Sequence, residues 1–281
     1  MPVASSRKVS RVVYTEEGPV AVLRLDRPEK LNAVNAEMVA DLGEALDRAE
    51  ASEAVRAVLL HGEGRAFSAG FDLDMGEDAS LDALSFVRRE LRRDFDVIMR
   101  FWDSPKPTVA AVHGYCLGSA MEMAVACDVT VAAAGCRFGA PEVCFGSGIV
   151  ALILPWVVGP KQSKELLLLG DDQVSAERAL ALGLVNRVVA PERCFDEAMQ
   201  IARGIAANDR LAVSLTKQAI NRSADIMGMR DALLQALELG VLAEAGETPE
   251  SRAFNEVLER DGPRAAIAWR RGGGTGSPGD R

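Results

Sequence analysis

Two glutamates, twenty positions apart, are the side chains best suited to chemistry in this sequence. Glu122 lies in the stretch GYCLGSAMEMAVACD (114–128), whose alanine, methionine, valine and cysteine residues indicate a buried helix. A buried carboxylate is costly unless it is paired, hydrogen-bonded or protonated. Ser119-x-x-Glu122 fits a capping box, which would be a structural explanation for the glutamate. Taken alone, this stretch fits a reacting acid or base equally well.

Backbone amides close to these glutamates form a second candidate group. RAFSAGFDL (65–73) places small residues and Gly70 directly after a predicted strand, and such a turn exposes consecutive N–H groups to a ligand. LGSAME (117–122) begins a helix, where unpaired amides and the helix dipole favour negative charge. FGAPEVCFGSG (138–148) places Glu142 after Pro141 in a loop. Two amide-presenting turns and two carboxylates together predict a site that stabilises an oxyanion and moves protons.

Other kinds of site are disfavoured. The two histidines, His61 and His113, each end a predicted buried strand, a place where a lone histidine is more often structural. No G-x-S-x-G nucleophile elbow and no G-x-x-x-x-G-K-[ST] phosphate loop occur. The four arginines within residues 88–93 share a predicted helix with Glu90 and Asp94, which is typical of a solvated helix face.

Alternating strands and helices must position these groups. Asn35 is a suitable N-cap for an amphipathic helix that runs to about Ala51, and residues 81–102 have the apolar period of a second long helix. From Gln162 onward the pattern is almost entirely helical, interrupted by a strand-like stretch at 184–189. The sequence therefore predicts an α/β fold with a helical C-terminal segment. The predicted strands of the first part are a pair joined by a Glu-Glu-Gly turn and ending at residue 26, then 57–64, 108–114 and 128–134.

Bulk composition limits the possible partners and location. The 281 residues are 48% hydrophobic, enough for one large or two modest domains, and the net charge of -9 argues against a nucleic-acid binder. The five cysteines form no C-x-x-C pair, which disfavours a zinc site or a disulfide framework and fits a reducing compartment. The longest apolar stretch, 149–158, is too short for a membrane span. We therefore expect a cytoplasmic protein that does not bind membranes.

Five sequence blocks, in order along most of the chain, resemble the enoyl-CoA hydratase/isomerase (crotonase) family. That resemblance implies a crotonase-like spiral of ββα units over residues 1–191 and a helical oligomerisation segment over 192–265. The glycine-rich end of the sequence predicts a flexible tail over 266–281. The resemblance also implies a homotrimer or a dimer of trimers, active in fatty acid metabolism. The blocks are LDRPEKLNAVNAEM (25–38), GRAFSAGFDL (64–73), KPTVAAVHGYCLGSAMEMAVACD (106–128), FGAPEV (138–143) and SAERALALGLVNRVV (175–189).

The resemblance assigns an oxyanion hole and a pair of acids. In this family two backbone N–H groups bind the thioester carbonyl oxygen, and here they would be those of Phe71 and Ser119. Such donors contribute roughly 3–4 kcal/mol each to the transition state. The family's hydratases use two glutamates, and both positions are filled, by Glu122 and Glu142. Two carboxylates in one dry pocket should titrate together, with one pKa raised.

The resemblance also implies how the acyl-CoA thioester is held. No separate cofactor and no metal are expected, because coenzyme A is part of the substrate. Arg27, Lys30 and Arg65 could meet its phosphates, although a solvated surface explains these three equally well. The remaining residues expected at the substrate are Ala66, Ser68, Ala69, Gly70, Asp72, Leu73 and Gly118.

Two departures from the family pattern bear on the reaction. The glycine-rich run is here Gly118-Ser119-Ala120, so two Cβ atoms lie beside the thioester. Typical hydratases carry a Gly-Gly-Thr loop after the second glutamate, and this chain has the apolar GSGIVALILPW (146–156) instead. The first hypothesis is syn hydration of a medium or aromatic 2-trans-enoyl-CoA to the 3-hydroxyacyl-CoA.

Other hypotheses remain open at this point. A Δ3,Δ2-enoyl-CoA or ring-epoxide isomerase would need proton shuttling but no water, and Glu142 alone could serve it. A non-catalytic acyl-CoA binder that keeps the fold is a third hypothesis, which the presence of both glutamates disfavours. Thioester hydrolases and dehalogenases of this fold use other side chains and rank lower.

Overall fold

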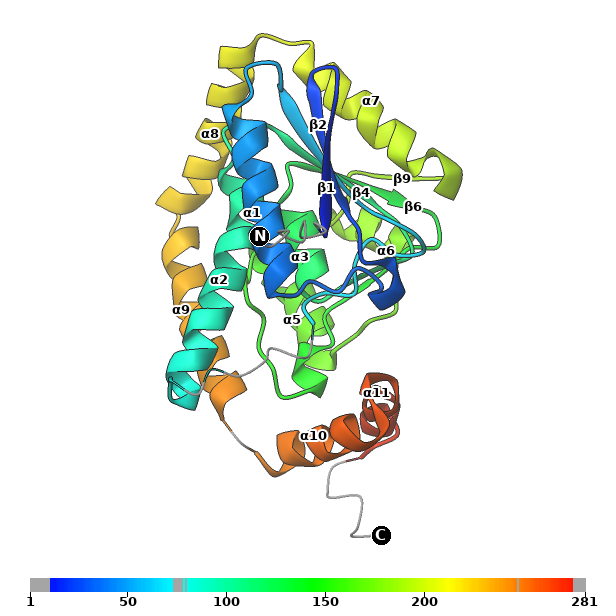
Figure 1. The fold of residues 1–281 in the computed structure, drawn as a ribbon, viewed down its shortest axis with the longest axis vertical. Coiled ribbons are helices and arrows are strands. Elements are labelled where there is room, and N and C mark those ends of the chain that lie inside the picture. Colours follow the sequence, from blue (N-terminus) through cyan, green and yellow to red (C-terminus); the bar gives the residue numbers. More distant parts are fainter. Residues whose placement is uncertain (1–10, 73–77, 79, 247, 275–281) are drawn as a thin grey trace, which may run out of the picture.

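A six-stranded sheet forms the centre of the computed structural model, which describes residues 11–72, 78, 80–246 and 248–274 (Figure 1). The first two strands are antiparallel, joined at Gly18, whose φ of +64° suits a tight turn. All later neighbours in this sheet are parallel. The strands lie in the order β1 (Val12–Glu17), β2 (Val20–Leu25), β3 (Ala57–Gly62), β4 (Thr108–Val112), β6 (Val129–Ala133) and β9 (Arg187–Val189).

Alternate residues of the strands build two separate cores. On β2, Leu23 and Leu25 face a core shared with α1 (Ala36–Ala51), α2 (Ala83–Asp103) and α3 (Ser119–Ala126). Val20 and Val22 face the opposite side, which α7 (Cys194–Ala206) covers (Figure 1). The period of two along each strand therefore decides which helix a residue meets.

Helix starts follow the predicted capping chemistry at α1. The Oδ1 atom of Asn35 accepts a hydrogen bond from the backbone N–H of Met38 at 3.0 Å, which confirms Asn35 as the N-cap. Asp82 caps α2 in the same way through the N–H of Ser85, at 2.9 Å. These caps fix where each helix begins relative to the sheet.

A second, three-stranded sheet brings together the loops that carry the candidate site. It contains β5 (Tyr115–Leu117), β7 (Arg137–Gly139) and β8 (Val174–Ser175), with β5 parallel to β7. A single bridge between Ser68 and Cys116 ties the predicted amide turn to β5. The 3-10 turn η2 (Glu142–Cys144) follows β7. As a result, residues 68, 117–122 and 142 converge around the start of α3.

The C-terminal part is helical, as predicted. However, α7 packs on the sheet as part of the core, although the sequence places it in the oligomerisation segment. The tail predicted from residue 266 is instead helical as far as Arg271, because Ala266 is buried against Phe254 and Val257. Residues 275–281 lie outside the described part. The further helices are α4 (Leu154–Val157), α5 (Pro160–Leu169), α6 (Ala176–Leu182), α8 (Arg210–Ile226), α9 (Met229–Ala245), α10 (Pro249–Asp261) and α11 (Pro263–Arg271).

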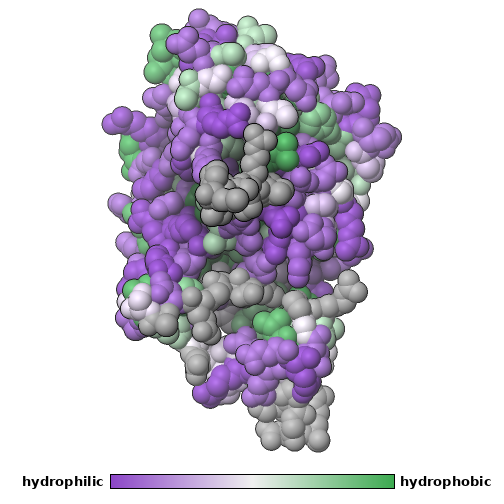
Figure 2. All heavy atoms as spheres, in the orientation of Figure 1, coloured by the Kyte–Doolittle hydropathy of each residue, from purple (hydrophilic) through white to green (hydrophobic). Residues whose placement is uncertain are grey.

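The predicted α/β class is confirmed, and so is the alternation of strands and helices that precedes the helical segment. Within the described residues, no helix has the length and apolar character needed to cross a bilayer. Figure 2 shows that the face seen in Figure 1 is mainly hydrophilic.

Candidate active site

Glu122 is held by the loop that follows the second glutamate. Its side chain is buried, and its two carboxylate oxygens accept hydrogen bonds from the backbone N–H groups of Val150 at 3.1 Å and Ala151 at 3.0 Å. The predicted capping box is wrong. Ser119 is the first residue of α3 rather than its N-cap, and Gly118 occupies the cap position without a side-chain hydrogen bond. Glu122 therefore fixes the loop rather than the helix start.

Glu142 is directed at the start of α3. A Cβ atom built on Gly118 would lie 2.3 Å from Glu142 Oε1, so the carboxyl group rests against this glycine. Its Oε2 atom is buried and, among the described residues, has no hydrogen-bond partner. The N–H groups of Phe145 at 2.9 Å and Ser147 at 3.1 Å donate to the Glu142 carbonyl oxygen and hold the turn. One carboxylate oxygen is thus left available to a ligand.

The two carboxyl groups are electrostatically linked. The pKa of Glu142 is raised to about 7, mainly by burial. A backbone N–H lowers it, and the charge of Glu244 on α9 raises it. Burial also raises the pKa of Glu122 well above its ordinary value, and the charge of Glu142 adds to this. The amides of Ala151 and Val150 act in the opposite direction. Burial and the shared charge therefore favour the protonated form of both acids, and their titrations are coupled.

The amides predicted to form an oxyanion hole lie in adjoining turns. The N–H of Val34 donates to Gly70 O at 2.8 Å, and the N–H of Asp72 donates to Val34 O at 2.9 Å. This parallel bridge leaves the N–H of Phe71 facing the other side, where the described residues provide no acceptor. The N–H of Ser119 begins α3 and is also without an acceptor in the described chain.

Gly70 allows these two turns to touch. Its φ is +93°, and a Cβ atom there would lie 2.8 Å from Leu117 O and 3.5 Å from the backbone nitrogen of Ser119. Only glycine combines this conformation with this close approach. The Ser119 hydroxyl, 3.5 Å from the same point, is buried and lacks a partner within the described residues. The geometry thus places two unused amides, an unused hydroxyl and the two acids around the start of α3.

Asn32, which the sequence reasoning missed, holds the amide turn in place. This residue is fully buried and has a φ of +54°. Its amide nitrogen donates to the carbonyl oxygens of Glu63 at 2.9 Å, Ala66 at 2.8 Å and Phe67 at 3.2 Å. The backbone carbonyl oxygen of Asn32 accepts a hydrogen bond from the Ser68 hydroxyl at 2.8 Å. The available signal was an asparagine shortly after Pro28 and before the helix capped by Asn35, since the short amide of asparagine tolerates φ > 0.

The residues expected near coenzyme A divide into two groups. Ala66 and Ser68 are buried in the amide turn, and the N–H of Ala69 donates to Leu31 O at 3.0 Å, so these residues form its frame. Arg27 is paired with Asp72, with 2.7 Å between Nη1 and Oδ2, and therefore holds the turn. Its predicted role toward the phosphates of coenzyme A stays a prediction.

Lys30 and Arg65 are exposed, so their predicted role toward phosphates stays a prediction. Leu73 lies outside the described residues. Sequence reasoning also missed Val150, Ala151 and the pair Ser147–Glu244, because the first two act through backbone atoms that leave no signal in residue type.

Comparison with known proteins supports one family throughout. A solved structure titled an enoyl-CoA hydratase/isomerase, from Xanthobacter autotrophicus Py2, superposes with a TM-score of 0.90 at 48% identity, covering 94% of this chain and 98% of the other. The short-chain-enoyl-CoA hydratase of Clostridium acetobutylicum is 33% identical over 269 residues, 92% of this chain and 94% of that protein. The 1,2-epoxyphenylacetyl-CoA isomerase of Escherichia coli K12 is 36% identical over 216 residues, 74% of this chain and 80% of that protein.

The family described as Enoyl-CoA hydratase/isomerase matches residues 15–256. This match and the superposition confirm the predicted crotonase fold. The chain belongs to the enoyl-CoA hydratase/isomerase family.

Proposed function

We propose that this protein adds water in syn fashion to a 2-trans-enoyl-CoA, giving the 3-hydroxyacyl-CoA. The observation that carries the proposal is the convergence of two carboxyl groups, that of the buried Glu122 and that of the half-buried Glu142, whose Oε2 atom is buried. Both lie near the start of α3, where the amide of Ser119 has no partner among the described residues. A hydration needs one group to accept a proton from water and one to deliver a proton to carbon. The pair provides both.

The two amides would bind the thioester carbonyl oxygen. As the water oxygen bonds to Cβ, the π electrons of the double bond move toward Cα and the carbonyl oxygen becomes negative. The N–H groups of Phe71 and Ser119 are preorganised to stabilise that charge, and neither has another acceptor in the described chain. Because the donors belong to the backbone, Phe and Ser side chains at these positions are compatible with the hole.

The acid pair would move the protons. With a pKa of about 7, Glu142 is partly ionised near neutral pH, and the raised pKa of Glu122 favours a pair that carries one proton. In this singly protonated state, the carboxylate takes the proton released by water and a carboxylic acid supplies the proton to Cα. The charge on the pair is the same before and after the addition, so the site returns to its starting state. Both new bonds form on the face of the double bond that the acids share.

The test follows the ultraviolet absorbance of crotonyl-CoA, which is lost when the conjugated double bond is hydrated. We expect the wild-type protein to remove the absorbance, and Glu122→Gln and Glu142→Gln each to reduce kcat at least about hundredfold. Glu177→Gln, which changes an exposed acid on α6, is the matched control and should keep full activity. Tight binding of acyl-CoA without turnover of any thioester would overturn the proposal in favour of a binding protein.

Isomerisation is the second candidate, and a specific observation favours it. Both oxygens of Glu122 are engaged by Val150 and Ala151, which leaves Glu142 as the acid with an uncommitted oxygen. A single acid can take a proton from C2 of a 3-enoyl-CoA and return it to C4. Formation of the conjugated thioester from 3-enoyl-CoA, with crotonyl-CoA unchanged and Glu122→Gln still active, would select this reaction. A series of short, medium and aromatic enoyl-CoAs tests the expected preference for medium or aromatic chains.

We also propose that the protein assembles as a homotrimer or as a dimer of trimers. Large apolar side chains are exposed along α8 and α9, including Ile226 at 79%, Met227 at 69% and Leu239 at 67%. Exposing this many large apolar side chains to water on one helical segment is unfavourable unless another protein surface covers them. Sedimentation at micromolar protein concentration should give a trimer or hexamer, and a monomer would contradict this part of the proposal.

A further inference from the structure

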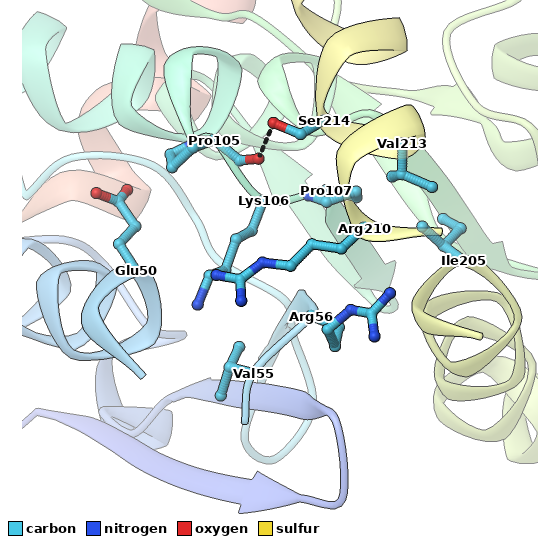
Figure 3. Close-up of a pocket in the computed structure, with 10 residues that line it drawn as sticks. All are labelled: Glu50, Val55, Arg56, Pro105, Lys106, Pro107, Ile205, Arg210, Val213 and Ser214. Atoms are coloured by element: carbon cyan, nitrogen blue, oxygen red, sulfur yellow. Dashed lines mark hydrogen bonds between the residues drawn. The ribbon is translucent and has the colours of Figure 1, made fainter. Parts of the chain in front are cut away.

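A small basic cavity lies at the end of the sheet opposite the candidate active site. It has a volume of about 130 Å³ (Figure 3). Arg56 directly precedes β3 and Lys106 lies just before β4, so the cavity is at the amino ends of these parallel strands. The loops with Phe71 and Ser119 follow the carboxyl ends of the same strands. A six-residue strand spans about 20 Å, so the two sites are separate.

The charges around this cavity are unbalanced. Arg56, Lys106 and Arg210 contribute three positive groups, whereas Glu50 contributes one carboxylate. Glu50 is itself paired with Arg100, with 3.2 Å between Oε1 and Nη2. Figure 3 shows the side chains of Lys106 and Arg210 extending into the same space. Burial lowers the pKa of Lys106, and the charge of Arg210 lowers it further. The charges of Glu50 and Glu16 act on this pKa in the opposite direction. Positive groups nevertheless outnumber carboxylates in the lining of the cavity.

Unused hydrogen-bond donors accompany this charge. The Lys106 ammonium donates to the carbonyl oxygens of Ala49 and Ser52, both at 2.6 Å, and one of its three N–H bonds remains. Arg56 donates to Asn208 O at 2.5 Å through one nitrogen. The guanidinium of Arg210 has no partner in the described part of the chain. The carbonyl contacts hold Lys106 and Arg56 in place, so their remaining donors are preorganised.

We propose that this cavity binds a phosphate dianion, either inorganic phosphate or the terminal phosphate monoester of a larger molecule. Guanidinium groups bind phosphate oxygens in pairs, and a dianion matches the surplus of positive charge. Arg210 is the first residue of α8, so the positive end of that helix also favours an anion. The volume accommodates one tetrahedral oxyanion with a few waters, not a nucleoside.

The test measures thermal unfolding of the full-length protein in increasing inorganic phosphate, with chloride keeping the ionic strength constant. Wild type should show a saturable rise in Tm at millimolar phosphate, as expected for a ligand that binds only the folded state. Arg210→Gln should raise the half-saturating phosphate concentration roughly tenfold or more. Arg222→Gln is the matched control, because it removes the same charge from an exposed position of the same helix. It should behave as wild type.

Phosphate also stabilises proteins without binding a site, and that effect would be linear and equal in all variants. An equal response of wild type and Arg210→Gln, or a wild-type response matched by acetate, would overturn the proposal. AMP distinguishes the two sources of the ligand. If AMP competes with inorganic phosphate, the cavity accepts the phosphate end of a larger molecule. If it does not, the cavity binds the free anion.

Discussion

Replacing Gly118 with alanine tests whether contact with the start of α3 positions the acid Glu142. The new Cβ atom would lie 2.3 Å from Glu142 Oε1, against the 3.4 Å or more of an ordinary contact. The carboxyl group, or the helix start, must therefore move by about 1.1 Å, the difference between these two distances. Gly118 also has a φ of +58° and a ψ of -131°, a conformation that residues with a side chain rarely adopt.

Both effects have expected magnitudes. A misplacement of about 1 Å in a catalytic constellation costs on the order of a hundredfold in rate. The backbone conformation costs about 1–3 kcal/mol of the free energy of unfolding. We therefore expect Gly118→Ala to lower kcat for crotonyl-CoA about a hundredfold. We expect it also to lower the free energy of unfolding by about 1–3 kcal/mol. Urea unfolding followed by circular dichroism gives the second quantity.

Gly43→Ala is the control for this experiment. Gly43 lies in the interior of α1 with nothing within 4 Å of a built Cβ atom. Alanine there should increase stability by about 0.5–1 kcal/mol and leave kcat unchanged. If Gly118→Ala loses stability but keeps kcat within about threefold of wild type, the contact with Gly118 does not position Glu142 and the reasoning fails.

Three further predictions concern the acids and the turn that faces them. The folded-state pKa of Glu142 is raised from 4.5 to about 7, so the folded protein binds more protons than the unfolded chain between these values, and stability falls as pH rises. This acid should account for about 3 kcal/mol of lost stability between pH 4.5 and 8, a loss that Glu142→Gln removes in urea titrations. Glu244→Gln removes a charge that raises the pKa of Glu142, so the part of the pH–kcat profile that reports Glu142 should move to lower pH. Ser147→Ala removes the hydrogen-bond partner of Glu244 but keeps its charge, and should therefore move the profile less. Asn32→Ala removes the side-chain donor from three carbonyl groups, two of them in buried hydrogen bonds, and should lower the free energy of unfolding in urea by about 2–4 kcal/mol. A loss below about 1 kcal/mol would contradict this role of Asn32.

The sequence predicted the parts of the fold that depend on residue type and period. The alternation on β2, the turn at Gly18 and the N-cap at Asn35 each follow from local rules, and the structure shows all three. The C-terminal helices were recognised for the same reason. The end of the last helix was missed because Ala266 is ordered by contacts with α10 that no local pattern reveals.

The candidate site was predictable in its residues but not in its connections. Gly70 and the two glutamates stand out by type and position. The capping box failed because a shift of one residue in the helix start turns Ser119 from N-cap into the first helical residue, and this is below what pattern reading resolves. The partners of Glu122 are backbone amides, which any residue except proline can supply.

Because backbone amides hold Glu122, the loss of the family's Gly-Gly-Thr loop after Glu142 matters less for this contact than the sequence suggests. An apolar stretch in place of a Gly-Gly-Thr loop seemed to put hydration in doubt, yet the N–H groups of Val150 and Ala151 still reach Glu122. What the apolar side chains change is the surroundings, because they keep water from the carboxyl groups and raise their pKa values by burial. Replacing Val150 with threonine, which keeps the amide and adds a hydroxyl, should therefore preserve the hydrogen bond to Glu122 while lowering its pKa. A shift of the pH–kcat profile without loss of maximal kcat would show that the loop acts through its amides and by excluding water from the carboxyl groups. Loss of kcat at every pH would show that the valine side chain itself is required.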